Sequence, residues 1–324
     1  MADLILDRYT ELSHRLTELA APWTAKYGVS KLANHLSTVL VSLAFFSSLQ
    51  ILSRIISPIF FPNSYKKLKP ITKKSWDVHF VAFWHAVIIT PLAAIQWYKV
   101  TTGSDKQPLR IDRTYGYDPE VGHVYAITLG YFIWDAWVSI LYDGPGFIAH
   151  GLVAMTAFVL AYRPVFMYDG LAFLLWELST PFLNIHWFLD KLGKTGSTLQ
   201  LINAFFLLST YVFARLTFGM YNSYHFFAHV LFPPTPHVPP LPAHVKYFYL
   251  IGNITLNSLN FFWFRAMIRA IQKRFNAVPE ADHDGVLDYK EVVKGKQKVA
   301  LKVEKKSNFD QEVAAGVARK PKAE

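Results

Sequence analysis

The chain has 324 residues, of which 52% are hydrophobic and 16% aromatic, and its formal net charge is +10. It contains no cysteine, which excludes disulfides, thiolate metal sites and a cysteine nucleophile. The positive charge does not indicate nucleic acid as a partner, because lysine and arginine lie mostly in loops and a tail that flank apolar blocks, where they set membrane topology and contact anionic lipid head groups.

The apolar residues form seven long blocks separated by polar loops. A helix of about 20 apolar residues crosses the hydrocarbon core of a bilayer and satisfies its own backbone hydrogen bonds there. We therefore predict an all-α fold, a polytopic transmembrane helical bundle of about seven helices. In the alternative, six helices span the membrane and the first block lies in the interface. The blocks cover about 36–61, 79–98, 123–142, 147–162, 165–189, 199–221 and 247–267.

These blocks divide the chain into five predicted regions. An amphipathic or loosely helical polar leader comes first, and the charged tail at the other end is poor in aromatic residues, a composition typical of disorder. The regions are the polar leader (1–33), the first transmembrane helix with its basic loop (34–69), a central core (70–225), a Pro- and His-rich loop with the last transmembrane helix (226–271) and the charged tail (272–324).

Loop charge predicts the orientation of the bundle. The loop from Lys66 to Lys74 and the tail hold the densest clusters of lysine and arginine near membrane ends. Cytosolic loops carry an excess of these residues. The seven-span pattern therefore predicts a lumenal N-terminus and a cytosolic C-terminus.

The last residues predict a location. Lys320 and Lys322 stand fifth and third from the end, a spacing that resembles the dilysine signal by which coat proteins retrieve membrane proteins to the endoplasmic reticulum. Such a signal is an address read by a receptor on the cytosolic side. We expect the endoplasmic reticulum membrane as the location and coat proteins as partners through these lysines. Chance in a lysine-rich tail is the alternative.

Several ionisable side chains fall inside the apolar blocks. Such residues are costly at membrane depth and are functional candidates by default. The alternative is that they pair with one another, or with backbone carbonyls, and only fix helix packing. Most of them lie in blocks three to five, so we expect any chemistry there rather than in blocks one or seven. The candidates are His79, His85, Asp135, His150, Glu177, His186 and Arg215.

The segment 170–189 carries the densest polar pattern. On a continuous helix Glu177, Pro181 and Asn184 lie close to one face, at steps of four and three residues. Pro181 has no N–H, so it frees the carbonyl of Glu177 from its usual helical partner. A polar, kinked face inside a bilayer implies a cavity or a partner helix.

The stretch from Glu177 to Asn184, followed by Trp187, resembles the signature of the TLC-domain family. It is most similar to the smaller non-synthase branch and more distantly to ceramide synthases. Three further motifs resemble the family in the right order, and together they cover roughly residues 70–225, so we expect a TLC-like core there. These motifs are His85-Ala86, Gly130-Tyr131-Phe132-Ile133 with Asp135, and Phe147-Ile148-Ala149-His150.

The resemblance implies roles for individual residues. Ceramide synthases transfer an acyl group from coenzyme A to a sphingoid amine, so acyl-CoA is an implied substrate. Imidazole suits a nucleophile or general base at neutral pH, which makes His150 the candidate, oriented by Asp135 or Glu177. By the same resemblance His85, Tyr131, Asn184 and Trp187 are expected to line a lipid cavity.

The sequence departs from the synthase pattern in ways that weaken the hypothesis that the chain is an acyltransferase. The second histidine of the family's pair is Gly151, and His186 stands where the smaller branch usually has an arginine. The acidic set upstream of Glu177 falls on Asp169, Gly170 and Phe173 and is largely absent. We therefore expect a protein of membrane lipid homeostasis that binds or senses lipid in a helical cavity, with membrane lipids as partners. The alternatives are an acyl-CoA-dependent N-acyltransferase and a membrane-protein interaction partner or chaperone.

Two metal motifs remain. His225 and His229, spaced i, i+4, suit zinc, although no carboxylate is adjacent. A second set in the tail falls on the positions of an EF-hand calcium loop with Gly285 at its sixth place, and here the alternative is a solvated acidic stretch. The calcium candidates are Glu280, Asp282, Asp284, Asp288 and Glu291.

Overall fold

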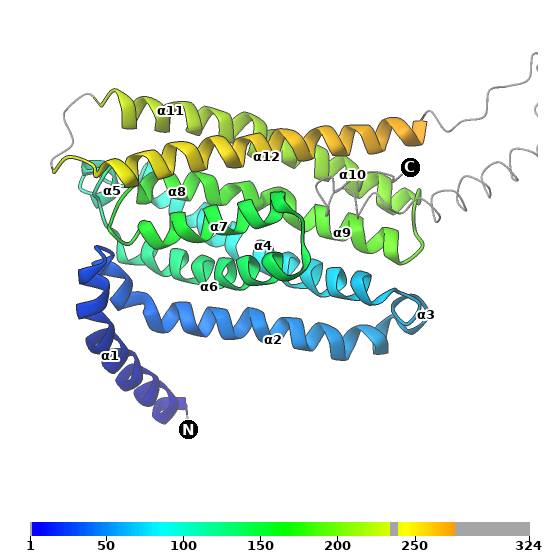
Figure 1. Cartoon of the computed structure of the whole chain (residues 1–324), viewed down its shortest axis with the longest axis horizontal. Helices are drawn as coiled ribbons and strands as arrows, with labels where there is room; N and C mark the ends of the chain where they lie inside the picture. The colour runs from blue at the N-terminus through cyan, green and yellow to red at the C-terminus, as the bar shows by residue number, and fades with distance from the viewer. Residues whose placement is uncertain (1, 234–238, 276–324) are drawn as a thin grey trace, which may run out of the picture.

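The computed structural model describes residues 2–233 and 239–275, and helices make up nearly all of this part of the chain. The long helices lie side by side along one axis (Figure 1), which confirms the predicted polytopic helical bundle. Within the described residues, four helical stretches are long and apolar enough to cross a membrane. They are Ser30–Phe60, Pro70–Thr102, Pro119–Tyr142 and Thr198–Leu231, and Pro145–Leu160 is a shorter apolar helix.

The leader forms a regular helix, α1 (Ala2–Lys26), followed by a 3-10 turn, η1 (Ser30–His35). Figure 1 shows α1 leaving one end of the bundle at an oblique angle. Small polar side chains dock α1 on the bundle: the hydroxyls of Ser13 and Ser37 lie 2.8 Å apart, and Thr17 donates to the carbonyl of Ala33 at 3.2 Å.

Four helices build the centre of the bundle, and small residues let their backbones approach closely. A Cβ atom on Gly130 would lie 2.5 Å from Cβ of Ser42, and the Ser42 hydroxyl donates to the carbonyl of Ile127 at 2.6 Å. Small residues at helix contacts are the usual basis of tight packing in membranes. The four helices are α2 (Leu36–Phe60), α4 (Pro70–Thr102), α6 (Pro119–Tyr142) and α7 (Pro145–Leu160), with short helices α3 (Pro62–Tyr65) and α5 (Pro108–Ile111) between them.

Local sequence signals start these helices. The Asp118 side chain caps α6 by accepting from the backbone N–H groups of Glu120 and Val121, which satisfies donors that have no partner in the first turn. Pro119 occupies the first position of the helix, where its missing N–H costs nothing. The Ser197 hydroxyl accepts from the N–H of Gln200 in the same way.

The second half of the bundle is built from interrupted helices. The predicted block 165–189 is α8 (Met167–Leu174), a 3-10 turn η2 (Leu175–Ser179) and α9 (Thr180–Lys191). The block 199–221 is α10 (Thr198–Tyr211), a π-helical turn η3 (Val212–Phe218) and α11 (Gly219–Leu231). The last helix is α12 (Ala243–Phe275). Pro181 explains the first break, because it cannot donate to the carbonyl of Glu177.

The connecting loops alternate between the two ends of the bundle. The loops after α3, between α6 and α7, and between α9 and α10 lie toward the same end (Figure 1). The basic stretch from Lys66 to Lys74, which is predicted to face the cytosol, begins in the first of them. The loop after α4, the described end of α11 and the start of α12 lie at the opposite end. The calcium candidates from Glu280 to Glu291, and Lys320 and Lys322, lie outside the described residues.

Candidate functional site

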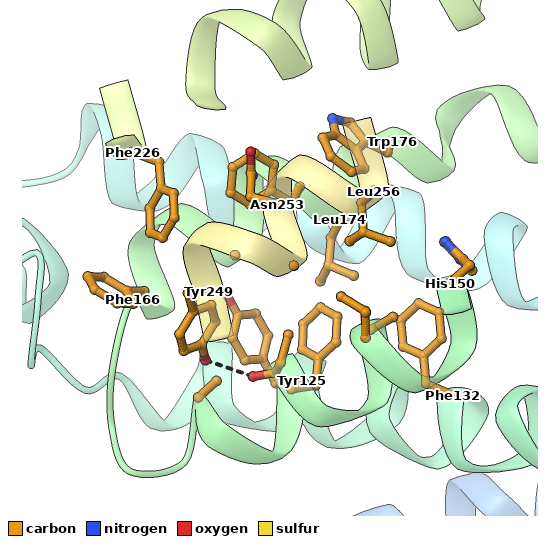
Figure 2. Close-up of a pocket in the computed structure, with 18 of the residues that line it drawn as sticks. Tyr125, Phe132, His150, Phe166, Leu174, Trp176, Phe226, Tyr249, Asn253 and Leu256 are labelled. Carbon is orange, nitrogen blue, oxygen red and sulfur yellow. Dashed lines mark hydrogen bonds between the residues drawn. The ribbon is translucent and has the colours of Figure 1, made fainter. Parts of the chain in front are cut away.

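A cavity of about 100 Å³ lies inside the second half of the bundle, and Figure 2 shows the residues around it. Its walls come from α6, α7, α8, η2, η3, α11 and α12, and most of the lining is aromatic or aliphatic. An apolar cavity with a few polar groups is the usual form of a small-molecule site.

Small residues on one face of α7 create the space. Ala154 and Ala157 of α7, and Ala161 directly after it, recur at helical spacing and line the cavity, as does Gly252 of α12. Tyr249 links α12 to α7 at the cavity, because its hydroxyl donates to the carbonyl of Ala157 at 2.8 Å (Figure 2). Larger side chains at these positions would fill the cavity.

One end of the cavity is aromatic. Phe166 packs edge-on against Phe226 and Tyr249, with ring centroids 5.0 and 5.2 Å away. Its backbone has φ of 56°, a left-handed conformation that bulky residues adopt rarely and at a cost. The Phe166 N–H donates to the carbonyl of Thr114 at 2.9 Å, so a specific backbone bond stabilises the strained turn before α8.

The opposite end of the cavity is polar, and Arg215 of η3 organises it. Its Nε lies 3.0 Å from the carbonyl of Trp176 and 3.1 Å from the hydroxyl of Ser179. Its Nη1 donates to Oδ1 of Asn260 at 3.0 Å, and its Nη2 donates to the hydroxyl of Thr180 at 3.1 Å. A single arginine therefore ties together η2, α9 and α12.

The local helix geometry explains why an arginine is placed here. The 3-10 turn η2 and Pro181 disturb the normal helical hydrogen bonds around residue 177, and the Arg215 guanidinium supplies donors to a carbonyl and to hydroxyls in that segment. The π-helical turn re-aims the side chains it carries, and such turns are frequent at functional sites.

Glu177 and His150 line the same cavity as Arg215. Glu177 is 8% exposed, and its Oε1 lies 3.8 Å from Nη2 of Arg215. Within the described part of the chain, its carboxylate accepts no hydrogen bond. The His150 ring meets Phe132 and Trp263 edge-on, with centroids 6.0 and 5.7 Å away.

Asp135 lies beside α7 and is not part of the cavity lining. A Cβ atom on Gly151 would stand 3.0 Å from its Oδ2 and 3.1 Å from Cα of Ala136. The close approach of α6 and α7 therefore explains the glycine where the family pattern has a second histidine. Of the three candidate catalytic residues, His150 and Glu177 share the cavity and Asp135 does not.

His85 and Tyr131 lie in the centre of the bundle, outside the lining of this cavity. Their rings stack with centroids 3.6 Å apart, and Phe46 packs edge-on against both. Both ring nitrogens of His85 are buried without a hydrogen-bond partner among the described residues. Their predicted role in lipid binding stays a prediction.

Asn184 and Trp187 also lie away from the cavity lining, on the side of α9 that packs against α4. Oδ1 of Asn184 is 2.7 Å from Nδ1 of His79, and the His79 ring stacks on Trp187 with centroids 4.2 Å apart. The predicted common face of Glu177 and Asn184 is therefore wrong, because the helix breaks between them and they face different neighbours.

The zinc hypothesis gains no support from the described residues, where no group of three metal-binding side chains is found. His229 instead lies 2.8 Å from the hydroxyl of Thr114 through its Nε2. This contact gives His229 a hydrogen-bonding role between α11 and the loop that precedes α6.

The expectation that any chemistry lies in blocks three to five rather than in block seven stays a prediction, although block seven takes part in the cavity. α12 forms one wall of the cavity and brings Asn253, Asn257 and Asn260 to a buried seam. Nδ2 of Asn257 donates to the hydroxyl of Ser223 at 3.0 Å. The spacing i, i+4, i+7 of these asparagines was a visible signal, since three amides on one face of a membrane helix need polar partners.

The comparisons with known proteins agree with this architecture. The TLC domain family matches residues 75–269, which extends beyond the predicted core into α12. An uncharacterised TLC domain-containing protein of Schizosaccharomyces pombe is 37% identical over 262 residues, which covers 80% of this chain and 86% of that protein. Topoisomerase I damage affected protein 4 of Saccharomyces cerevisiae is 25% identical over 265 residues, covering 77% and 89%. TLC domain-containing protein 4-A of Xenopus laevis is 26% identical over 251 residues, covering 72% and 91%. The chain therefore belongs to the TLC domain family.

Proposed function

We propose that this TLC domain protein binds a membrane lipid in the cavity between α7 and α12 and acts in lipid homeostasis of the endoplasmic reticulum. The observation that carries the proposal is the two-ended character of the cavity. Phe166 and Phe226 lie at one end and His150 at the other (Figure 2). Glu177 and Arg215 line the same cavity, and Arg215 donates to the carbonyl of Trp176, which lies toward the His150 end. A lipid has the same two-ended character, an apolar chain and a polar head.

The size of the cavity indicates how much of a lipid it holds. An engineered apolar cavity of about 150 Å³ accepts a molecule the size of benzene. The cavity here has about 100 Å³, so it accommodates only the polar end and the first carbons of a lipid, and the proposal requires the rest of the chain to lie outside this cavity.

A filling substitution tests lipid binding. The purified full chain is extracted and its bound lipid is measured by mass spectrometry. Ala157→Trp places a large ring in the cavity, and we expect the bound lipid to fall to background. Leu152→Trp is the matched control, because Leu152 lies on the same helix and is 39% exposed on its outer side. Equal lipid content in the parent and in Ala157→Trp would contradict the proposal.

A second candidate is an acyl-CoA-dependent N-acyltransferase. It is favoured by one observation, that His150 and Glu177 line the same cavity. In this reaction the amine nitrogen attacks the thioester carbonyl and the imidazole accepts a proton from the amine. The C–S bond then breaks, and coenzyme A leaves as the thiol with that proton, so the products are the amide and free coenzyme A. The test supplies acyl-CoA and a sphingoid base and measures the amide, with His150→Ala as the inactive variant. Absence of product from the parent protein would leave lipid binding as the function.

The location is part of the proposal. The proposed orientation is supported by the bias of lysine and arginine toward the loop from Lys66 to Lys74. Fluorescence microscopy of the tagged chain is expected to show the endoplasmic reticulum, and Lys320→Ala with Lys322→Ala is expected to move it onward. Protease protection is expected to cleave a C-terminal tag from the cytosolic side and to spare an N-terminal one. The opposite protection pattern would reverse the orientation.

A further inference from the structure

Among the described residues that line the cavity, Arg215 is the single cation, and it is already hydrogen-bonded to the protein. Each of the three nitrogens of Arg215 donates to a protein acceptor, among them Asn260 and Thr180. Arg215 is only 7% exposed, and its Nη2 also faces Glu177 at 3.8 Å. A phosphate or carboxylate entering the cavity would have to share the guanidinium with these acceptors and with the Glu177 carboxylate.

Glu177 adds to this exclusion of anions. It lines the cavity, it is more than nine-tenths buried, and its carboxylate accepts no hydrogen bond from the described residues. A buried acceptor with unused capacity stabilises a donor and repels a negative charge, and repulsion is strong where water is excluded. The ligand must therefore bring a hydrogen-bond donor to Glu177.

The charge of the donor is constrained as well. Among the described residues that line the cavity, Glu177 and Arg215 already balance each other, so an added ammonium group would be a third charge without its own counter-ion in this lining. Burying such a charge is unfavourable. An uncharged donor meets the need of Glu177 without this cost.

His150 supplies the complementary contact. It lines the cavity, and its contacts with Phe132 and Trp263 are ring contacts. An imidazole N–H can donate to an oxygen. A hydroxyl group is both donor and acceptor, so one hydroxyl satisfies Glu177 and His150 together.

We infer that the cavity selects lipids whose polar end is an uncharged hydroxyl, such as a long-chain alcohol or a monoacylglycerol, over lipids with an anionic or cationic end. The hydroxyl donates to Glu177 and accepts from His150, and the chain follows the alanine face of α7 toward Phe166 and Tyr249. This inference rests on the proposed lipid binding and adds the class of ligand to it.

Chain-matched ligands test this selection. The full chain in detergent is titrated with hexadecan-1-ol, 1-monopalmitoylglycerol, hexadecanoic acid, hexadecyl phosphate and hexadecylamine, and affinity is measured by displacement of a fluorescent lipid. We expect at least one of the two hydroxyl ligands to bind at least about tenfold more tightly than the acid, the phosphate and the amine. The ranking between the alcohol and the glyceride identifies the source of the hydroxyl. An acid or phosphate that binds as tightly as the better hydroxyl ligand overturns the inference, and so does an amine that binds most tightly.

Glu177→Gln tests the cause of the selection. Glutamine keeps an acceptor oxygen and removes the charge, so the preference for the hydroxyl ligand over the acid should fall to about twofold or less. An unchanged preference in folded Glu177→Gln overturns the role assigned to Glu177, and the ligand series on the parent protein tests selection if this variant does not fold. Failure of the proposed function has a different signature: no ligand binds, and Ala157→Trp retains the same bound lipid as the parent.

Discussion

A Cβ atom on Gly151 of α7 would stand 3.0 Å from Oδ2 of Asp135 on α6. This contact is tighter than ordinary van der Waals packing, and the backbone of Ala136 lies on the same side at 3.1 Å. The glycine at residue 151, where the family motif has a second histidine, and the close packing of α6 on α7 therefore depend on each other. A side chain at residue 151 requires Asp135 and the backbone of Ala136 to shift away from α7.

Gly151→Ala is therefore expected to destabilise the bundle. Overpacking of a tight contact costs about 1–3 kcal/mol, and Gly151→His should cost more and should not create a paired histidine site. Gly146→Ala is the matched control, because a Cβ there would meet only Leu259 at 3.5 Å. Thermal unfolding in detergent measures both. If Gly151→Ala melts at the same temperature as the parent, the contact between α6 and α7 accommodates a Cβ atom at residue 151.

Removal of the Arg215 side chain should have a larger effect. Breaking a buried charge pair by deleting one partner costs about 3–5 kcal/mol, and Arg215→Gln also leaves the carbonyl of Trp176 and the side chain of Asn260 without their partner. Hydrogen exchange should rise in η2 and in the middle of α12.

A surface ion pair gives the comparison. Lys99 and Glu120 lie 2.8 Å apart but are 55% and 64% exposed, so Lys99→Gln should leave the melting temperature nearly unchanged. Equal effects of Arg215→Gln and Lys99→Gln would contradict the organising role of Arg215.

The Tyr249 hydroxyl should hold α12 against α7. Tyr249→Phe removes its hydrogen bond to the carbonyl of Ala157, and loss of one such bond costs about 1 kcal/mol. Tyr247→Phe is the control on the same helix, since Tyr247 is 59% exposed. We expect a lower melting temperature and faster loss of bound lipid for Tyr249→Phe alone. A variant that keeps its lipid as long as the parent would mean that this bond does not close the cavity.

The turn between α6 and α7 should respond to pH. Burial raises the pKa of Asp143 from its ordinary value of 3.8 to about 6, although the Ser139 hydroxyl, 3.3 Å from Oδ2, acts in the opposite direction. The folded chain thus binds this proton more strongly than the unfolded chain. The contribution of Asp143 to stability therefore falls as pH rises from about 4 to about 6.

Asp143→Asn isolates this effect. Asparagine does not titrate, so the variant should gain stability relative to the parent as pH rises through this window, and the difference should be constant above it. Melting temperatures of both proteins across the range provide the measurement. Parallel pH profiles would show that Asp143 ionises at its ordinary value.

Some of this architecture follows from the sequence by itself. Long apolar blocks leave a chain few choices in a bilayer, because backbone groups without water must pair within a helix. The helical bundle, the approximate ends of its helices and the break near Pro181 follow from that rule and from the chemistry of proline. The ionisable residues at membrane depth, among them Glu177, His150 and Arg215, were also visible.

Only the tertiary structure decided which of these residues meet. Glu177 and Asn184 share a face on an ideal helix, but the 3-10 turn rotates them toward different neighbours, Arg215 and His79. Likewise the π-helical turn aims Arg215 at η2, and α12, far along the chain, supplies Asn260 and a cavity wall. Periodicity reports the directions of side chains within one regular helix, whereas the meeting of three helices depends on packing between residues distant in sequence.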